Sequence, residues 1–173
     1  MKLLHYSDKN LYTKTEQFNF QNPPFDPITF AQDIVKFMYD RNAITVAAPH
    51  VGISYRVFAM RGMPENFVCF NPKIVMPSSD EVKLDESSIV VPGLIVKVTR
   101  PQHVKVRFAT PNGEIRTETF TGMTARAFQQ SCQALDGLPF WSGVSRLELS
   151  MALKRAQKNS FTFPCHNFYR YCG

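Results

Sequence analysis

Three polar side chains could carry out nucleophilic chemistry if the fold brings them together: His50, Ser88 and Ser131. A serine hydroxyl that is hydrogen-bonded to an imidazole is a nucleophile activated by a neighbouring base. Such a site also needs an acid that orients the imidazole and donors that stabilise an oxyanion. Glu86 is a candidate for the acid, but a carboxylate here can equally hold a loop in place. No oxyanion donors can be assigned from the sequence. A hydrolase with a non-metal Ser/His site is therefore the second alternative to the main hypothesis given at the end of this section.

A further set of potential metal ligands lies near the C-terminus: Cys165, His166 and Cys172. Structural zinc sites take four ligands at characteristic spacings, and these three residues do not follow such a spacing. We therefore predict no metal there. The four cysteines of the chain are scattered without a disulfide framework, which favours reduced thiols in a cytoplasmic-type compartment.

The element that must position Ser131 is a predicted helix over residues 124–137. Thr124 is a candidate N-cap and Gly137 a candidate helix stop. Gln130 and Ala134 stand four residues apart and therefore share one face. An apolar stripe at helical spacing consists of Ala125, Phe128, Cys132 and Leu135.

The rest of the chain predicts a mixture of short strands and two further helices. Leu147, Met151 and Leu153 alternate with basic residues in the last of these helices, which suggests an apolar stripe there. Residues 1–22 predict an extended arm, and residues 111–114 predict a turn. The predicted helices are 28–39 and 145–158, and the predicted strands are 56–60, 67–70, 94–99 and 104–109.

Length and composition indicate one globular domain. The chain has 173 residues, of which 44% are hydrophobic, and this is enough for a full core. No apolar run is long enough to span a membrane, and the first residues do not form a secretory signal, so no membrane partner is predicted. The net charge of +6 permits contact with nucleic acid, but no RNA-binding motif is present, so nucleic acid is not indicated as a partner.

Three stretches carry a pattern that is more specific than composition. Residues 43–52 read Ala-Ile-Thr-Val-Ala-Ala-Pro-His-Val-Gly, and residues 86–93 read Glu-Ser-Ser-Ile-Val-Val-Pro-Gly. Residues 125–137 hold Ala-Arg at the start, a glutamine at 129 and Leu-Asp-Gly at the end. In this order they resemble the peptide deformylase motifs Gly-x-Gly-Leu-Ala-Ala-Pro-Gln-Val-Gly, Glu-Gly-Cys-Leu-Ser-Val-Pro-Gly and Gln-His-Glu-x-x-His. The resemblance implies an α+β fold in which antiparallel strands surround a central helix.

The resemblance also implies a chemistry that several aligned residues do not match. Deformylases, which remove the formyl group from nascent polypeptides, hold a divalent metal through Cys, His and His, and a Glu moves protons. The aligned residues here are Ser88, Gln130 and Ala134 for the ligands and Ser131 for the Glu. His50 stands where the family has a Gln that binds the formyl oxygen; an imidazole can also donate a hydrogen bond. We therefore predict no metal cofactor and a degenerate pocket lined by His50, Glu86, Ser88, Ile89, Gln130, Ser131 and Ala134.

These observations lead to the hypothesis of a catalytically inactive domain. We expect a structural or protein-binding subunit of a larger assembly, with a phage tail or baseplate component as one concrete candidate located in the virion. The alternative is a pseudoenzyme. It would bind peptide N-termini, or a ribosome-side partner, in the cleft that corresponds to the deformylase active site. The expected partners are protein subunits.

The expected domain boundaries separate a deformylase-like domain, residues 1–158, from a C-terminal tail, residues 159–173. The tail is rich in aromatic residues, and side chains of this kind are common at the centre of interfaces. It can contact a partner or fold back to complete the core of the domain, and the sequence leaves both readings open. The candidate contact residues are Phe161, Phe163, Phe168, Tyr169, Arg170 and Tyr171.

Overall fold

The computed structural model describes residues 1–159 and has an α+β fold, as the sequence predicted. The helices are α1 (Pro27–Asp40), α2 (Gly122–Leu135) and α3 (Arg146–Lys158), and the 3-10 turns are η1 (Lys9–Tyr12) and η2 (Ala48–Val51). The strands are β1 (Thr45–Ala47), β2 (Val57–Met60), β3 (Phe67–Pro77), β4 (Glu81–Ser88), β5 (Val91–Pro101), β6 (His103–Ala109) and β7 (Ile115–Thr121). None of the helices within residues 1–159 is long and apolar enough to cross a membrane.

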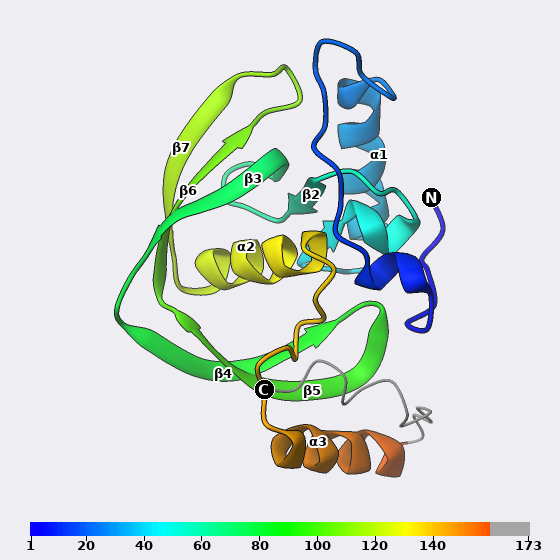
Figure 1. Ribbon diagram of the computed structural model, residues 1–173, viewed down its shortest axis with the longest axis vertical. Helices are drawn as coiled ribbons and strands as arrows, with labels where there is room; N and C mark the ends of the chain where they lie inside the picture. The colour runs from blue at the N-terminus through cyan, green and yellow to red at the C-terminus, as the bar shows by residue number, and fades with distance from the viewer. Residues whose placement is uncertain (160–173) are drawn as a thin grey trace.

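The strands form two antiparallel sheets on either side of α2 (Figure 1). The larger sheet has the order β1-β2-β3-β6-β7, and the smaller one is the β4–β5 hairpin. Helix α2 packs against strands of the larger sheet and also against β5. Helix α1 packs on β1 and β2, and α3 packs on the β5 strand of the hairpin. Antiparallel strands thus surround a central helix, as the family resemblance implied.

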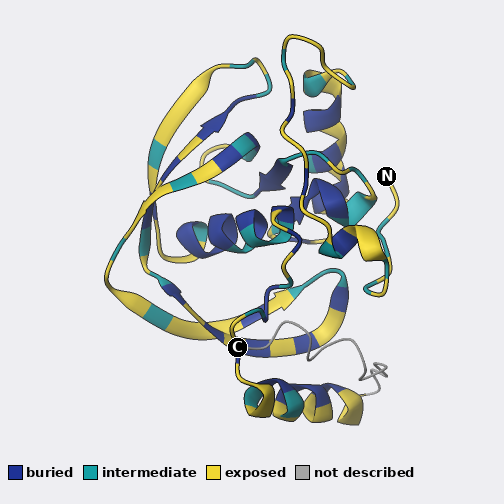
Figure 2. Ribbon diagram, viewed as in Figure 1, coloured by how far each residue is buried: buried dark blue, intermediate teal, exposed yellow. Residues whose placement is uncertain are grey.

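Helix α2 is buried on nearly all sides, as Figure 2 shows. The Phe128 ring is fully buried and meets Phe58 at a centroid distance of 5.2 Å and Phe120 at 5.6 Å. Polar residues of the helix, such as Gln129 and Ser131, are buried as well, so α2 is not the half-exposed helix typical of a protein surface. The predicted apolar stripe is confirmed, because all of its members are buried: Ala125, Phe128, Cys132 and Leu135.

The two ends of α2 agree with the sequence prediction to different degrees. The helix begins at Gly122 with Thr121 as its N-cap, so the prediction of Thr124 as N-cap is wrong. It ends at Leu135, and Gly137 has a φ of 74°, the left-handed conformation that favours glycine after a helix. A Cβ atom at Gly137 would lie 2.8 Å from the carbonyl carbon of Thr13, so the N-terminal arm requires glycine here.

The N-terminal arm is tied to the domain along the end of α2. The backbone N–H of Thr15 donates to the carbonyl of Leu135 at 2.9 Å, and its hydroxyl donates to the same oxygen at 2.8 Å. The predicted extended arm is interrupted by η1, whose N-cap Asp8 accepts from the backbone N–H of Asn10. The two bonds of Thr15 fix the arm against the C-terminal end of α2.

The outer helices begin at side-chain caps, and the buried face of α1 contains the apolar residues of the predicted 28–39 helix, whereas that of α3 differs from the prediction. Asp26 accepts from the backbone N–H of Thr29 at the start of α1. In α3 the predicted apolar stripe is wrong in two of its three positions, because Leu147 is 71% exposed and Met151 is 52% exposed. The side chains of α3 that pack in the core are Leu149, Ala152, Leu153 and Ala156.

Removing the Phe128 ring should destabilise the whole domain. We expect Phe128→Ala to lower the free energy of unfolding by about 3–5 kcal/mol, because it leaves a cavity between α2 and the sheet. Urea unfolding followed by circular dichroism measures this. The control Leu147→Ala removes an exposed side chain and should change stability by less than about 0.5 kcal/mol. Equal losses in the two variants would contradict this account of the core.

Candidate functional site

One cavity of about 280 Å³ lies where α2 meets β1, η2 and the turn of the β4–β5 hairpin. Its apolar wall comes from residues that follow α2, such as Phe140 and Trp141, from Val91, which belongs to the same apolar cluster, and from Ile44. Ile44 is 55% exposed, so apolar surface continues to the mouth of the cavity. The structure brings all seven residues of the predicted pocket to this cavity: His50, Glu86, Ser88, Ile89, Gln130, Ser131 and Ala134.

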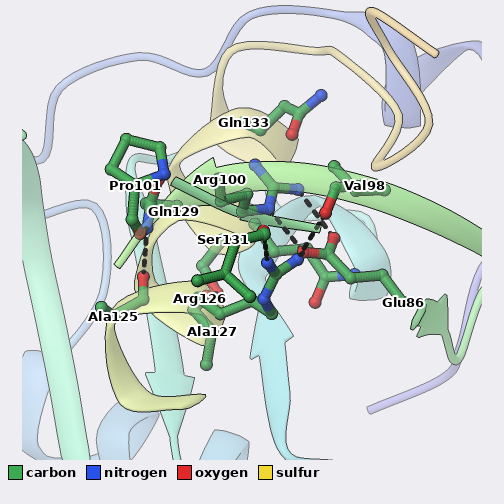
Figure 3. Close-up of polar contacts among 12 residues, drawn as sticks. Glu86, Val98, Arg100, Pro101, Ala125, Arg126, Ala127, Gln129, Ser131 and Gln133 are labelled. Atoms are coloured by element: carbon green, nitrogen blue, oxygen red, sulfur yellow. Dashed lines mark hydrogen bonds and ion pairs between the residues drawn. The ribbon is translucent and has the colours of Figure 1, made fainter. Parts of the chain in front are cut away.

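A buried cluster of one carboxylate and two guanidinium groups borders the cavity, and Glu86 and Arg126 of this cluster line it (Figure 3). The exposed carboxylate of Asp85 also lines the cavity. Glu86 accepts from Nε of Arg100 at 2.6 Å and from Nη2 at 2.8 Å, which makes a bidentate pair. Nη1 of Arg126 donates to the same carboxylate at 2.6 Å and to the carbonyl of Val98 at 3.0 Å. Because these bonds join β4, β5 and α2, Glu86 is a structural carboxylate and does not orient His50.

His50 is a neutral side chain that can offer one hydrogen-bond donor. Its Nδ1 accepts from the backbone N–H of Ala47 at 3.2 Å. Burial lowers the pKa of His50 from 6.5 to about 4, so the ring is uncharged at neutral pH. Since Nδ1 accepts, the single ring proton lies on Nε2, and Nε2 is the donor that remains.

The two serines of the cavity are engaged with other groups. Ser131 Oγ lies 2.9 Å from the carbonyl of Ala127 and 2.6 Å from the hydroxyl of Thr45, which also reaches the carbonyl of Ala59. Ser88 Oγ accepts from the backbone N–H of Val90 at 3.4 Å. Within residues 1–159 neither serine hydrogen-bonds to His50, so the proposed Ser/His pair is not assembled.

The residues at the aligned ligand positions do not fit a divalent metal. Ser88 offers a neutral hydroxyl, Gln130 an amide and Ala134 no donor atom, whereas such sites select thiolate, imidazole or carboxylate. The amide of Gln130 already donates to the carbonyl of Ser87 at 2.9 Å. In the part of the chain that the structure describes, no group of three or more His, Cys, Asp or Glu residues could hold an ion.

Two features of the site were missed by the sequence reasoning. Thr45 stands at the second glycine of the first family motif and was given no role, yet its hydroxyl contacts Ser131 from β1. The pairing of Glu86 with Arg100 and Arg126 was missed as well, because it joins residues 14 and 40 positions apart and no local pattern reveals it. The possible partner contacts in residues 161–171 lie outside the described residues, so they and the protein-subunit partners stay predictions.

The comparisons with known proteins agree on one family. The model of a family described as polypeptide deformylase matches residues 1–150. A relative from Rhizobium meliloti named peptide deformylase-like is 34% identical, over 74% of this chain and 76% of its own. A relative from Gloeobacter violaceus named peptide deformylase 2 is 35% identical, over 71% and 67%.

Solved structures are similar over almost the whole chain. A peptide deformylase from Synechococcus elongatus in complex with actinonin has a TM-score of 0.83 at 27% identity, and covers 93% of this chain and 86% of its own. A peptide deformylase from Legionella pneumophila has a TM-score of 0.82 at 26% identity, with coverages of 92% and 94%.

These findings correct the functional hypothesis drawn from the sequence. The prediction that the chain is not an enzyme is contradicted, because its relatives are named as deformylases. The inactive structural or protein-binding subunit is contradicted with it, and so are the pseudoenzyme and Ser/His alternatives. The findings do not support a phage tail or baseplate component in a virion; they point to a deformylase.

Removing the charge of Glu86 should cost much stability. We expect Glu86→Gln to lower the free energy of unfolding by about 3–5 kcal/mol, because it leaves two buried guanidinium groups without a counter-charge. The neighbouring Asp85 makes an exposed pair with Lys97 at 3.5 Å, so Asp85→Asn should cost less than about 1 kcal/mol. Urea unfolding of both variants tests this, and a small loss for Glu86→Gln would contradict the structural role.

His50 should make the stability of the domain depend on pH between 6.5 and 4. The unfolded chain binds a proton on His50 near pH 6.5, but the folded chain binds it only near pH 4, so the free energy of unfolding falls as the pH falls through this window. The full effect amounts to about 3 kcal/mol, from about 1.4 kcal/mol per unit of pKa. His50→Gln cannot titrate, so urea unfolding at pH 7 and at pH 4.5 should show a smaller loss in the variant. An equal loss would contradict a buried neutral imidazole.

Proposed function

We propose, from the premise that the chain belongs to the polypeptide deformylase family, that it removes the formyl group from the N-terminus of peptides in the cavity beside α2. The reaction is the hydrolysis of a formamide. Water adds to the formyl carbon, the carbon–nitrogen bond breaks, and formate and a free amine leave.

The observation that supports this proposal most is that the stretches matching the family motifs line the cavity. The three matching stretches reach it from η2, from the β4–β5 turn and from α2, and each contributes lining residues. The apolar wall is suited to an apolar side chain at the peptide N-terminus, and the few polar groups are suited to fixing its orientation. A mixed wall of this kind is typical of a binding site for a small or extended ligand.

His50 is the residue that we assign to the formyl oxygen. His50 lines the cavity, its Nε2–H is the donor that remains, and the ring is uncharged at neutral pH. A donor of this kind binds the carbonyl oxygen and stabilises the negative charge that develops on it when water adds. This supports a role for His50 as the residue that polarises the bond to be cleaved.

The divalent metal that the family resemblance implies is not part of this assignment. Ser88, Gln130 and Ala134 do not fit such an ion, so no step of the reaction is assigned to it. The groups of this chain to which we assign roles are the donor of His50 and the apolar wall of the cavity.

We infer that the reaction takes place in a reducing, cytoplasmic-type compartment. Cys69 and Cys132 are free thiols in the core, and burial raises the pKa of Cys132 to about 12, so this thiol stays protonated. Two unpaired buried cysteines are typical of proteins that work where thiols are kept reduced.

A formyl-methionyl peptide tests the proposed function. We expect formate release by the full chain, and a drop in kcat/KM of about 10²–10³-fold in His50→Ala, because one oxyanion donor is lost. His50→Gln keeps a donor and should lose less. Leu147→Ala, on the outer face of α3, should leave the rate unchanged.

Binding can be followed separately in the same experiment. Trp141 is the only tryptophan of the chain and lines the cavity, so its fluorescence should change on adding the formylated peptide. The same peptide without its formyl group should produce a smaller change at equal concentration. Absence of both formate release and a fluorescence change would overturn the proposal, and binding without formate release would overturn its hydrolytic part.

A further inference from the structure

Two side-chain hydrogen bonds connect segments that are far apart in the sequence, at positions where the chain departs from the family motifs. Gln130 Nε2 on α2 donates to the carbonyl of Ser87 at the end of β4, 2.9 Å away. The hydroxyls of Thr45 on β1 and Ser131 on α2 lie 2.6 Å apart. Three of these four residues, Thr45, Gln130 and Ser131, replace a glycine, a histidine and a glutamate of the family pattern.

The Thr45–Ser131 contact must be a hydrogen bond, because of the acceptors available to the two hydroxyl hydrogens. These acceptors are the two neighbouring carbonyls and the oxygen of the other hydroxyl. The hydroxyls touch one another, and they also reach the carbonyls of Ala59 and Ala127. If both hydrogens pointed to the carbonyls, two oxygens 2.6 Å apart would face each other with no hydrogen between them. One hydroxyl therefore donates to the other, and the chain of bonds ends on one of the two carbonyls. Ser131 is only 2% exposed, so water does not compete for these bonds.

The donor atoms of these two hydrogen bonds are therefore already bound to groups of the protein itself. An ion at this place would meet no thiolate, imidazole or carboxylate among Ser88, Gln130 and Ala134. It would also have to remove Gln130 from the carbonyl of Ser87 and leave that carbonyl without its donor.

We propose that these two hydrogen bonds form a metal-independent joint, which holds the β4–β5 turn and β1 on α2 in the place where the family's metal ligands would connect the hairpin to the helix. Gln130 and the Thr45–Ser131 pair are then positioning residues: they fix the walls of the cavity. The joint goes beyond the proposed function, because it holds whether or not the cavity releases formate.

The first test is metal binding by the 173-residue chain. Protein produced in medium supplemented with iron, nickel and zinc should contain no stoichiometric ion by elemental analysis. Its melting temperature should not change on adding zinc or nickel, or after treatment with a chelator. One bound ion per chain would overturn the proposal. A rise in melting temperature on adding zinc that disappears in Gln130→Leu would overturn it as well.

The second test locates the joint within the fold. We expect Gln130→Leu to speed amide hydrogen exchange at the β4–β5 turn. Gln133→Leu is the matched control, because Gln133 also donates from α2 to a carbonyl, that of Pro139, but does not reach the hairpin. Equal exchange at the turn in both variants would overturn the role of Gln130.

A double-mutant cycle tests the Thr45–Ser131 bond. The stability losses of Thr45→Val and Ser131→Ala should be non-additive, with the double variant losing less than the sum. Additive losses would overturn this half of the joint. Formate release measured on the same preparations tests the proposed function separately. If a chelator abolishes the release, the joint is overturned and the proposed function stands. If no formate is released but the stability losses are non-additive, the proposed function is overturned and the joint stands.

Discussion

The fold of this chain depends on one buried carboxylate held between two guanidinium groups. Glu86 on β4 accepts from Arg100 on β5 and from Arg126 on α2, so a single side chain fastens the hairpin to the central helix. Taking three charges out of water is costly, and the arrangement is stable only because nearly every polar atom has a partner. The carbonyls of Val82 and Val98 also accept hydrogen bonds from the Arg126 guanidinium group, which compensates part of its lost hydration.

This cluster decides which residues of the cavity are available for binding. Both carboxylate oxygens of Glu86 are occupied, so the charged part of the wall is structural. Apart from the exposed carboxylate of Asp85, the other polar groups at the cavity are uncharged: the neutral ring of His50, the amide of Gln130 and the hydroxyls. The Arg–Glu cluster and the Gln130 bond act on the same hairpin, one at its middle and one at its end, and together they fix the cavity wall.

Much of the fold could be predicted from the sequence, because periodicity reports burial directly. The stripe of α2 was predicted from its 3.6-residue period, and Gly137 from the helix stop that its left-handed conformation allows. In α3 two faces have helical spacing, and only packing against β5 decides that Leu149 rather than Leu147 is buried. The Thr45–Ser131 bond joins residues 86 positions apart, so no local pattern could reveal it. The functional hypothesis was wrong because it weighed four aligned positions above a family match that spans residues 1–150.

A cavity whose buried charges are already paired discriminates between the substrate and the product of the reaction that we propose. A formylated peptide N-terminus is an uncharged amide, whereas the product has a free amine that is protonated at neutral pH. Bringing an ammonium group into a partly buried apolar cavity costs far more than bringing in an amide whose oxygen finds a donor such as His50. Glu86 cannot offset that charge, because Arg100 and Arg126 already hold it, and the other carboxylate at the cavity, Asp85, is exposed to solvent and paired with Lys97. The same electrostatics that fasten the hairpin to α2 therefore favour binding of the formylated peptide and release of the deformylated one.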